Sequence, residues 1–215
     1  MKILALEFSS PLHSVAVWSE GGVRGRSEER GTRHVKPFAQ IDAALKQAGV
    51  TREDIDCIAV GLGPGSHAGI RIATAIAQGW QLARGTKLIG LGSADCAAQQ
   101  FAAQGDAAPF SVVIDAQRDE FFAARYAIKD RRAHLTEGFR LMTDADWARQ
   151  RAGERFIRPD VLEHGPAWLA LPPEAATLAR LAAQATEFVP GHALEPVYLR
   201  KAEFVKAPPP RFPMP

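Results

Sequence analysis

The sequence has little of what secretion or membrane insertion requires. Among its 215 residues it has two cysteines, Cys57 and Cys96. The first seven residues hold only four consecutive apolar residues before Glu7, whereas a signal peptide needs an apolar stretch of about 7–15 residues. No run of about 18 apolar residues is present, so no membrane span is predicted. We therefore expect reduced thiols, a cytoplasmic location and no contact with a membrane.

A charge excess of one sign is also missing. The chain carries 26 Lys and Arg against 24 Asp and Glu, a net charge of +2. A protein that grips nucleic acid alone usually has a basic excess, so nucleic-acid binding is not expected to be its sole function. The apolar share of 47% lies in the globular range and excludes a largely disordered chain.

Residue patterns for metal binding and nucleophilic hydrolysis are absent. The closest of the six histidines are 21 residues apart, so no two share a helix face at i and i+4. The cysteines form no Cys-x-x-Cys pair, and both lie in apolar surroundings typical of inert core thiols. Ser66 does not stand in a Gly-x-Ser-x-Gly elbow. We expect no bound metal ion and no hydrolase activity.

Two similar halves follow one another along the chain. The first predicts strands at 3–7, 13–18, 23–30, 55–60 and 87–91, with helices at 37–48, 68–83 and 93–103. The second predicts strands at 111–114, 120–128, 135–141 and 155–157, with helices at 143–149 and 174–186. This repeated βββαβα order predicts an α/β fold built by internal duplication. We expect subdomains at 1–105 and 106–206 and a proline-rich tail at 207–215.

A glycine-rich loop, Gly61 to Arg71, joins a strand to a helix and is the strongest local signal. Glycines let a ligand approach the backbone, and a helix N-terminus offers free N–H groups to an anion. The loop matches neither the Walker pattern nor the strict dinucleotide pattern. The alternative is a tight turn without a ligand. The candidate nucleotide or phosphate site comprises Glu7, Ser9, Ser10, Gly63, Pro64, Gly65 and Ser66, with Asp115 facing it from the second half.

Apolar residues cover much of the circumference of the helix at 68–83. One strip serves the sheet, and a second is expected to be exposed unless the preceding helix covers it. The sequence therefore predicts a partner surface formed by the helices 37–48 and 68–83, both of which lie in the predicted N-terminal subdomain. Its residues are Phe38, Ile41, Leu45, Gly69, Ala73, Ala77 and Trp80.

Several motifs together resemble one family. They are the opening Ile3–Ser10, the loop Gly61–Arg71, Leu88–Leu91, Val113–Gln117 and Glu195–Arg200. These segments are similar to the TsaB family, also called YeaZ, whose members are noncatalytic relatives of the transferase TsaD. The resemblance implies an actin-like, sugar-kinase-like fold of two subdomains. It also implies a dimer-forming scaffold subunit needed for the N6-threonylcarbamoyladenosine modification of tRNA.

The resemblance further implies which partners and cofactors to expect. TsaD carries a His-x-x-x-His metal pair where this chain has Ser93 and Ala97, and serine and alanine do not hold such an ion. The implied partners are a TsaD-like catalytic subunit, a TsaE-like ATPase and a second copy of the chain, with tRNA reached through the complex. No cofactor is expected on the chain alone, and ATP only in the complex. The alternative is an ATP-dependent small-molecule kinase of the same fold.

Overall fold

The first half of the chain forms a five-stranded sheet. The computed structural model describes residues 1–31, 36–105, 108–117, 120–143, 146, 155–165 and 168–199. The strands are β1 (Ile3–Glu7), β2 (Leu12–Ser19), β3 (Gly22–Arg30), β4 (Cys57–Gly61) and β5 (Lys87–Leu91). They lie in the order β3-β2-β1-β4-β5. The first three run antiparallel, while β4 and β5 are parallel to β1.

The second half repeats this arrangement in a second sheet. Its strands are β6 (Phe110–Gln117), β7 (Glu120–Lys129), β8 (Arg132–Thr143), β9 (Arg155–Arg158) and β10 (Leu169–Ala170). Their order, β10-β9-β6-β7-β8, and their directions match the first sheet strand for strand. The predicted duplicated α/β fold of actin-like type is therefore confirmed. Strand β10 was not predicted from the sequence because two residues leave no periodic pattern.

Three of the described helices begin and end within one residue of their predicted bounds, whereas the helix predicted at 174–186 ends at Ala182. The described helices are α1 (Pro37–Ala48), α2 (His67–Arg84), α3 (Ser93–Ala103) and α5 (Ala175–Ala182). Gly49 and Gly85 end α1 and α2 in the left-handed conformation, as glycine readily does. The helix predicted at 143–149 lies largely outside the described residues. Of that range the structure describes Thr143 and Asp146, whose side chain and backbone groups exchange hydrogen bonds.

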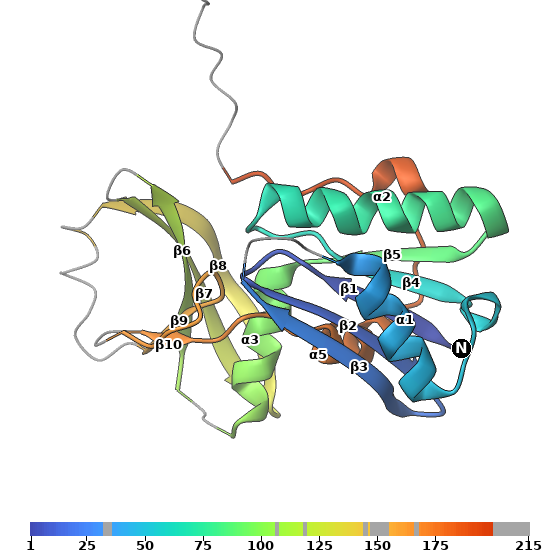
Figure 1. The fold of residues 1–215 in the computed structure, drawn as a ribbon. Helices are drawn as coiled ribbons and strands as arrows, with labels where there is room; N and C mark the ends of the chain where they lie inside the picture. Colours follow the sequence, from blue (N-terminus) through green and yellow to red (C-terminus); the bar gives the residue numbers. More distant parts are fainter. Residues whose placement is uncertain are drawn as a thin grey trace, which may run out of the picture.

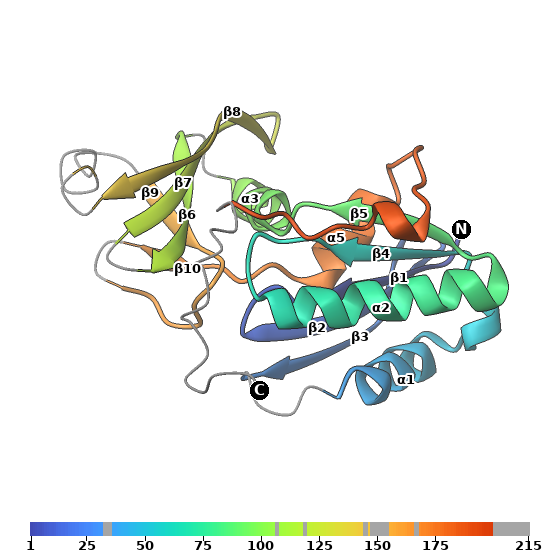
Figure 2. The same cartoon turned by 90° about the horizontal axis from the view of Figure 1, so that it is seen from above.

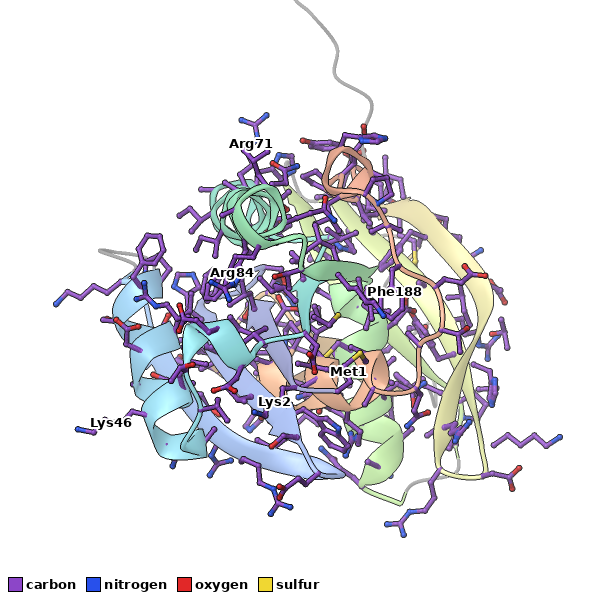
Figure 3. The ribbon with its side chains drawn as sticks, turned by 90° about the vertical axis from the view of Figure 1, so that its right-hand side faces the viewer. Met1, Lys2, Lys46, Arg71, Arg84 and Phe188 are labelled. Atoms are coloured by element: carbon purple, nitrogen blue, oxygen red, sulfur yellow. The ribbon has the colours of Figure 1, made fainter. Side chains whose placement is uncertain are left out.

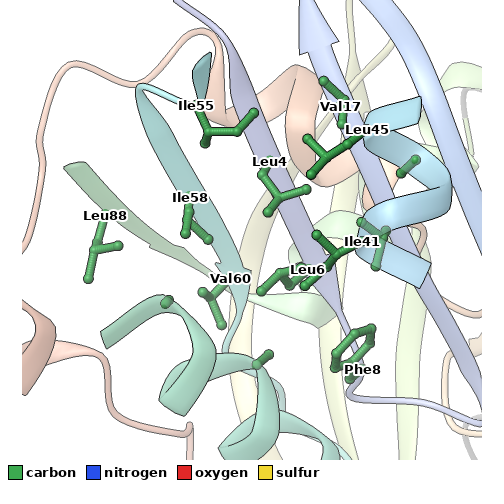
Figure 4. Packing of buried hydrophobic residues seen from close by; sticks show 14 of the residues in the cluster. Leu4, Leu6, Phe8, Val17, Ile41, Leu45, Ile55, Ile58, Val60 and Leu88 are labelled. Carbon is green, nitrogen blue, oxygen red and sulfur yellow. The ribbon is translucent and has the colours of Figure 1, made fainter. Parts of the chain in front are cut away.

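Side chains alternate between the two faces of the first sheet and form a separate hydrophobic core on each face. Leu4, Leu6 and Phe8 point to the face that α1 and α2 cover (Figure 4). Ile3 and Ala5 point to the opposite face and pack against α5. All five are fully buried. Because the period of a strand is two, one short apolar run supplies both layers.

Helices α3 and α5 lie between the two sheets, and each packs on the sheet of the other half (Figure 1). Phe101 of α3 contacts Phe110 of the second sheet, with 4.5 Å between ring centroids. From α5, the backbone N–H of Ala175 donates to the Ser14 hydroxyl of the first sheet at 2.8 Å. The strands of the two sheets thus divide between β5 and β6, whereas helices α3 and α5 each pack on the sheet of the other half. The tail at 207–215 lies outside the described residues.

Most of the predicted partner surface is in fact core. Ile41, Leu45, Ala73 and Ala77 are buried against the first sheet, and Gly69 is buried beside Phe8. The prediction for these five residues is wrong because the small-residue strip of α2 is the one that faces the sheet. Phe38 is 58% exposed, and Trp80 is half-buried.

Two glycines of α2 allow a matched test of this packing. A Cβ at Gly69 would overlap the carbonyl oxygen of Phe8, whereas a Cβ at Gly79 meets nothing within 4 Å. We expect Gly69→Ala to lower the free energy of unfolding by about 1–3 kcal/mol. Gly79→Ala is expected to raise it by roughly 0.5–1 kcal/mol through helix propensity. Urea unfolding of both variants checks this, and equal effects at the two positions would contradict the packing of α2.

Candidate functional site

A cleft of about 640 Å³ opens between the two halves of the molecule. The first half lines it with the β1–β2 turn and with the loop that leads into α2. The second half supplies residues from β6, β7 and the segment after β9. Five of the seven predicted site residues meet there: Ser9, Ser10, Pro64, Gly65 and Ser66.

The loop is pressed tightly against the β1–β2 turn. The Ser66 N–H donates to the Ser9 carbonyl at 2.6 Å, and the Ser66 hydroxyl accepts the Gly69 N–H at 3.3 Å as the N-cap of α2. Gly65 has φ +158°, and a Cβ there would overlap the Ser9 carbonyl oxygen. The tight turn into the helix is thus confirmed, and it requires glycine at residue 65.

Glu7 and Gly63 lie behind the loop, not in the cleft. Glu7 is fully buried. Its Oε1 accepts the Ser9 N–H at 2.9 Å, and its Oε2 accepts the Ser93 hydroxyl at 2.9 Å. Ser93 Oγ in turn accepts the Gly63 N–H at 3.0 Å. The prediction that Glu7 contacts a nucleotide is therefore wrong, because both of its oxygens are occupied inside the protein.

Burial controls the protonation of Glu7. Loss of solvent raises the pKa of its carboxyl above the ordinary value of 4.5, and the hydrogen bonds from Ser9 and Ser93 oppose this shift. The carboxyl group of Glu7 therefore has a structural role, through its hydrogen bonds to Ser9 and Ser93, and its ionised form is energetically costly in the folded state.

Two acids form the opposite wall of the cleft, Asp115 and Asp160. Arg158 binds Asp160 through two hydrogen bonds of 3.1 and 2.8 Å, and Asp160 Oδ2 accepts the Asp115 N–H at 3.0 Å. The sequence analysis missed Asp160. Because β6 and β9 are parallel neighbours, residues towards their carboxyl ends meet at one edge of the sheet, which is the signal that would have found Asp160.

Known proteins match both the sequence and this architecture. The family model described as tRNA N6-adenosine threonylcarbamoyltransferase (TsaD) matches residues 21–191. In solved structures, YeaZ from Pseudomonas aeruginosa is 26% identical, with a TM-score of 0.76 over 92% of this chain and 99% of that one. The chain belongs to the TsaB/YeaZ family.

Curated relatives in this family are matched over part of their length. The tRNA threonylcarbamoyladenosine biosynthesis protein TsaB of Escherichia coli is 33% identical over 129 residues, 59% of this chain and 55% of that protein. The TsaB of Haemophilus influenzae is 28% identical over 140 residues, 65% of this chain and 59% of that protein. These alignments thus span a little over half the length of the curated relatives.

Two further residues of the cleft were not predicted from the sequence, His13 because it lies inside a strand and Tyr198 because it is far along the chain from the other cleft residues. His13 of β2 lines the cleft while only 4% exposed. Burial lowers the pKa of its imidazole below 6.5, and the charge of Glu29 acts in the opposite direction. Tyr198 lies at the cleft beside His67, with 5.0 Å between ring centroids.

Other side chains with possible chemistry lie in the interior. Both cysteines are buried, and loss of solvent raises the pKa of Cys57 to about 12. Ser93 and Ala97 are fully buried on one side of α3. Within the described ranges, no group of three His, Cys, Asp or Glu side chains is placed to hold a metal ion. The helices described also include none long and apolar enough to cross a membrane.

The buried carboxyl of Glu7 gives a testable pH dependence. Because its pKa is raised on folding, the folded state binds this proton more tightly than the unfolded state. Its contribution to stability therefore falls as pH rises from the unfolded value near 4.5 through the folded value. We expect the difference in melting temperature, Glu7→Gln minus the unmodified chain, to increase as pH rises through this range. Each 1 kcal/mol corresponds to about 2–4 °C.

Thermal unfolding between pH 4 and 8 measures this difference. A difference that stays constant across the range would show that Glu7 does not titrate there. Glu163→Gln, at an exposed position, serves as the control and is expected to follow the unmodified chain.

Proposed function

We propose that the chain is a noncatalytic scaffold subunit in the synthesis of N6-threonylcarbamoyladenosine in tRNA, where it pairs with a TsaD-like transferase. The names of the curated relatives and the match to the transferase model support this role. The observation that supports a noncatalytic role is the pair of residues on the buried side of α3. TsaD has a metal-binding histidine pair at these two positions, whereas this chain has Ser93 and Ala97.

The geometry of α3 supports a structural use of these two positions. Ala97 packs among apolar residues of the second sheet. Ser93 connects Glu7 to Gly63 by hydrogen bonds. A methyl group and an engaged hydroxyl in a closed interior offer no ligand set for a metal ion.

The proposed complex contains further members. Besides the TsaD-like subunit, we propose a TsaE-like ATPase and, when the chain is alone, a second copy of itself. Contact with tRNA is made through the complex. ATP is bound only when the catalytic partner is present. The rival proposal is a small-molecule kinase acting alone, and it differs in requiring ATP turnover without any partner.

The partner surface is proposed on the side of α2 that faces α1. The C-terminal segment 189–199 occupies the other side, where Gln78 Nε2 donates to the Gly191 carbonyl at 2.8 Å (Figure 2). Towards α1, Ile72 and Ile76 are half-buried on α2, and Phe38 is exposed on α1. On the outer side of α2, where Arg71 points away from the sheet (Figure 3), Leu82 is 91% exposed. This apolar surface is unusual for an isolated chain.

The first prediction for this role concerns pairing. Gly79 lies on the exposed side of α2 with open space around it. Gly79→Arg should keep or raise stability by about 0.5–1 kcal/mol, because arginine favours a helix more than glycine. It places a long cation where helices of a partner would approach, so we expect loss of both self-association and pairing with TsaD. Light scattering alone and with TsaD measures both.

Control variants separate the surface from a general charge effect. Ala103→Arg adds the same side chain at an exposed position at the end of α3 and should leave pairing intact. Phe38→Asp should abolish pairing as Gly79→Arg does. If Gly79→Arg and Phe38→Asp are both folded and still pair normally, the partner surface lies elsewhere.

The second prediction concerns chemistry by the chain alone. Purified protein should contain less than stoichiometric zinc and iron and should not hydrolyse ATP. Elemental analysis after gel filtration and a phosphate-release assay measure these quantities. Steady ATP turnover by the isolated chain would favour the kinase alternative.

A further inference from the structure

The hairpin formed by β7 and β8 carries the positive charge excess of the chain. From Glu120 to Thr143 it has five Lys and Arg against three Asp and Glu, a net charge of +2. The whole chain has the same net charge, so the residues outside this hairpin are neutral together. The equivalent hairpin of the first half, β2–β3, has three residues of each sign from Leu12 to Arg30. The two halves have therefore diverged in charge at matching strands.

Alternation along β7 places its cations on the face of the second sheet that α3 does not cover. Tyr126 and Ile128 point into the core beneath α3 (Figure 1). Arg125 and Lys129 alternate with them and therefore project from the opposite face. Arg132 of β8 is the cross-strand partner of Lys129, and cross-strand partners lie on the same face. All three cations are exposed to solvent.

A fourth cation, Arg140, lies on this face beside Arg125. Glu137 is between them, with 3.6 Å to the guanidinium group of Arg125 and 3.8 Å to that of Arg140. Within the described residues, Lys129 and Arg132 form no ion pair. The step from Arg125 to Lys129 spans about 14 Å, at about 3.4 Å per residue. We call the face with these four cations the outer face of the hairpin.

The turn at the end of the hairpin is attached to α3. Asp130 and Arg131 have φ values of 52° and 57°, the left-handed pair of a type I′ turn, whose twist suits two antiparallel strands. Arg131 Nη2 donates to the Ala103 carbonyl at the end of α3 at 3.2 Å. Lys129 and Arg132 flank this turn, so their backbone has a fixed position relative to the helix.

We propose that the outer face of the hairpin contacts the phosphate backbone of tRNA in the complex. The proposal rests on the proposed function, in which tRNA is reached through that complex. Cations spread over about 14 Å suit a polymer with repeated negative charges better than one small anion. Three of the four are arginine, whose guanidinium group matches phosphate through parallel N–H donors. Contacts of this kind position an RNA without reading its sequence.

The small net charge of the chain limits its share of the contact. A domain that binds nucleic acid alone usually has a larger basic excess, so we expect the catalytic partner to supply the remaining contacts. The affinity of the isolated chain for tRNA should accordingly be weaker than that of the complex, and it should fall as salt rises.

Two double variants compare the equivalent hairpins at equal loss of charge. Lys129→Gln with Arg132→Gln removes two cations of the outer face. Arg26→Gln with Arg30→Gln removes two exposed cations of β3, the matching strand of the first half. A fluorescent, unmodified tRNA transcript is titrated with each chain, alone and with TsaD, at salt concentrations between about 50 and 200 mM. Anisotropy gives the dissociation constant and its dependence on salt.

We expect the Lys129/Arg132 variant to bind tRNA at least about tenfold more weakly than the Arg26/Arg30 variant. The slope of log K against log salt should become shallower by about 1.4–1.8, because each lost phosphate contact changes it by about 0.7–0.9. Lys129→Gln alone should give about half of that change in slope. The Arg26/Arg30 variant should bind as the unmodified chain does. Polyglutamate is the second probe, and binding as tight as that of tRNA would indicate an acidic protein partner and overturn the proposal.

Light scattering separates this surface from the pairing with TsaD. Both double variants should pair normally, because the proposed partner surface lies on α1 and α2. If the unmodified chain fails to pair, the proposed function is contradicted, and tRNA binding by the isolated chain then decides the role of the hairpin. Melting temperatures confirm that the variants are folded. Equal tRNA affinities of the two folded double variants, or no tRNA binding by the unmodified chain either alone or with TsaD, would overturn the proposal.

Discussion

One buried carboxylate connects the parts on which the cleft depends. Glu7, at the end of β1, accepts hydrogen bonds from the turn at Ser9 and from Ser93 at the start of α3. Ser93 then holds the loop at Gly63. A side chain at Gly61 would overlap the Glu7 carboxylate, so β4 comes this close only because residue 61 is glycine. The hydrogen bonds to Glu7 offset part of the free-energy cost of burying its carboxyl group, and they hold the β1–β2 turn, the start of α3 and the loop at Gly63 together.

Helix α2 combines two requirements on its opposite sides. Its small residues let it lie directly on the sheet, with Gly69 against the Phe8 carbonyl and with Ala73 and Ala77 in the core. Its outer side retains apolar residues without a described neighbour to cover them, Leu82 most of all. The same helix starts at the cleft and extends to the proposed partner surface.

The duplication explains why a cleft exists at all. Two sheets of the same order face each other across α3 and α5, and the turns and loops at their ends meet between them. The halves have diverged in what they present. The first lines the cleft with Ser9, Ser10 and Ser66, whereas the second lines it with Asp115 and Asp160. In the described part of the second half, residues 159–165 between β9 and β10 form no helix in the place of α2, so only one wall carries a helix N-terminus.

The sequence by itself determined every described strand except β10, the bounds of α1, α2 and α3, and the duplicated order, because periodicity and glycine positions are local properties. It also placed Ser9, Ser10 and the loop 64–66 at one site. Only the tertiary structure decided which strip of α2 faces the sheet, because two apolar strips on one helix are equivalent until a neighbour covers one. It likewise turned Glu7 inward, and it brought His13, Asp160 and Tyr198 to the cleft. Those contacts join residues far apart in the chain, which no local pattern encodes.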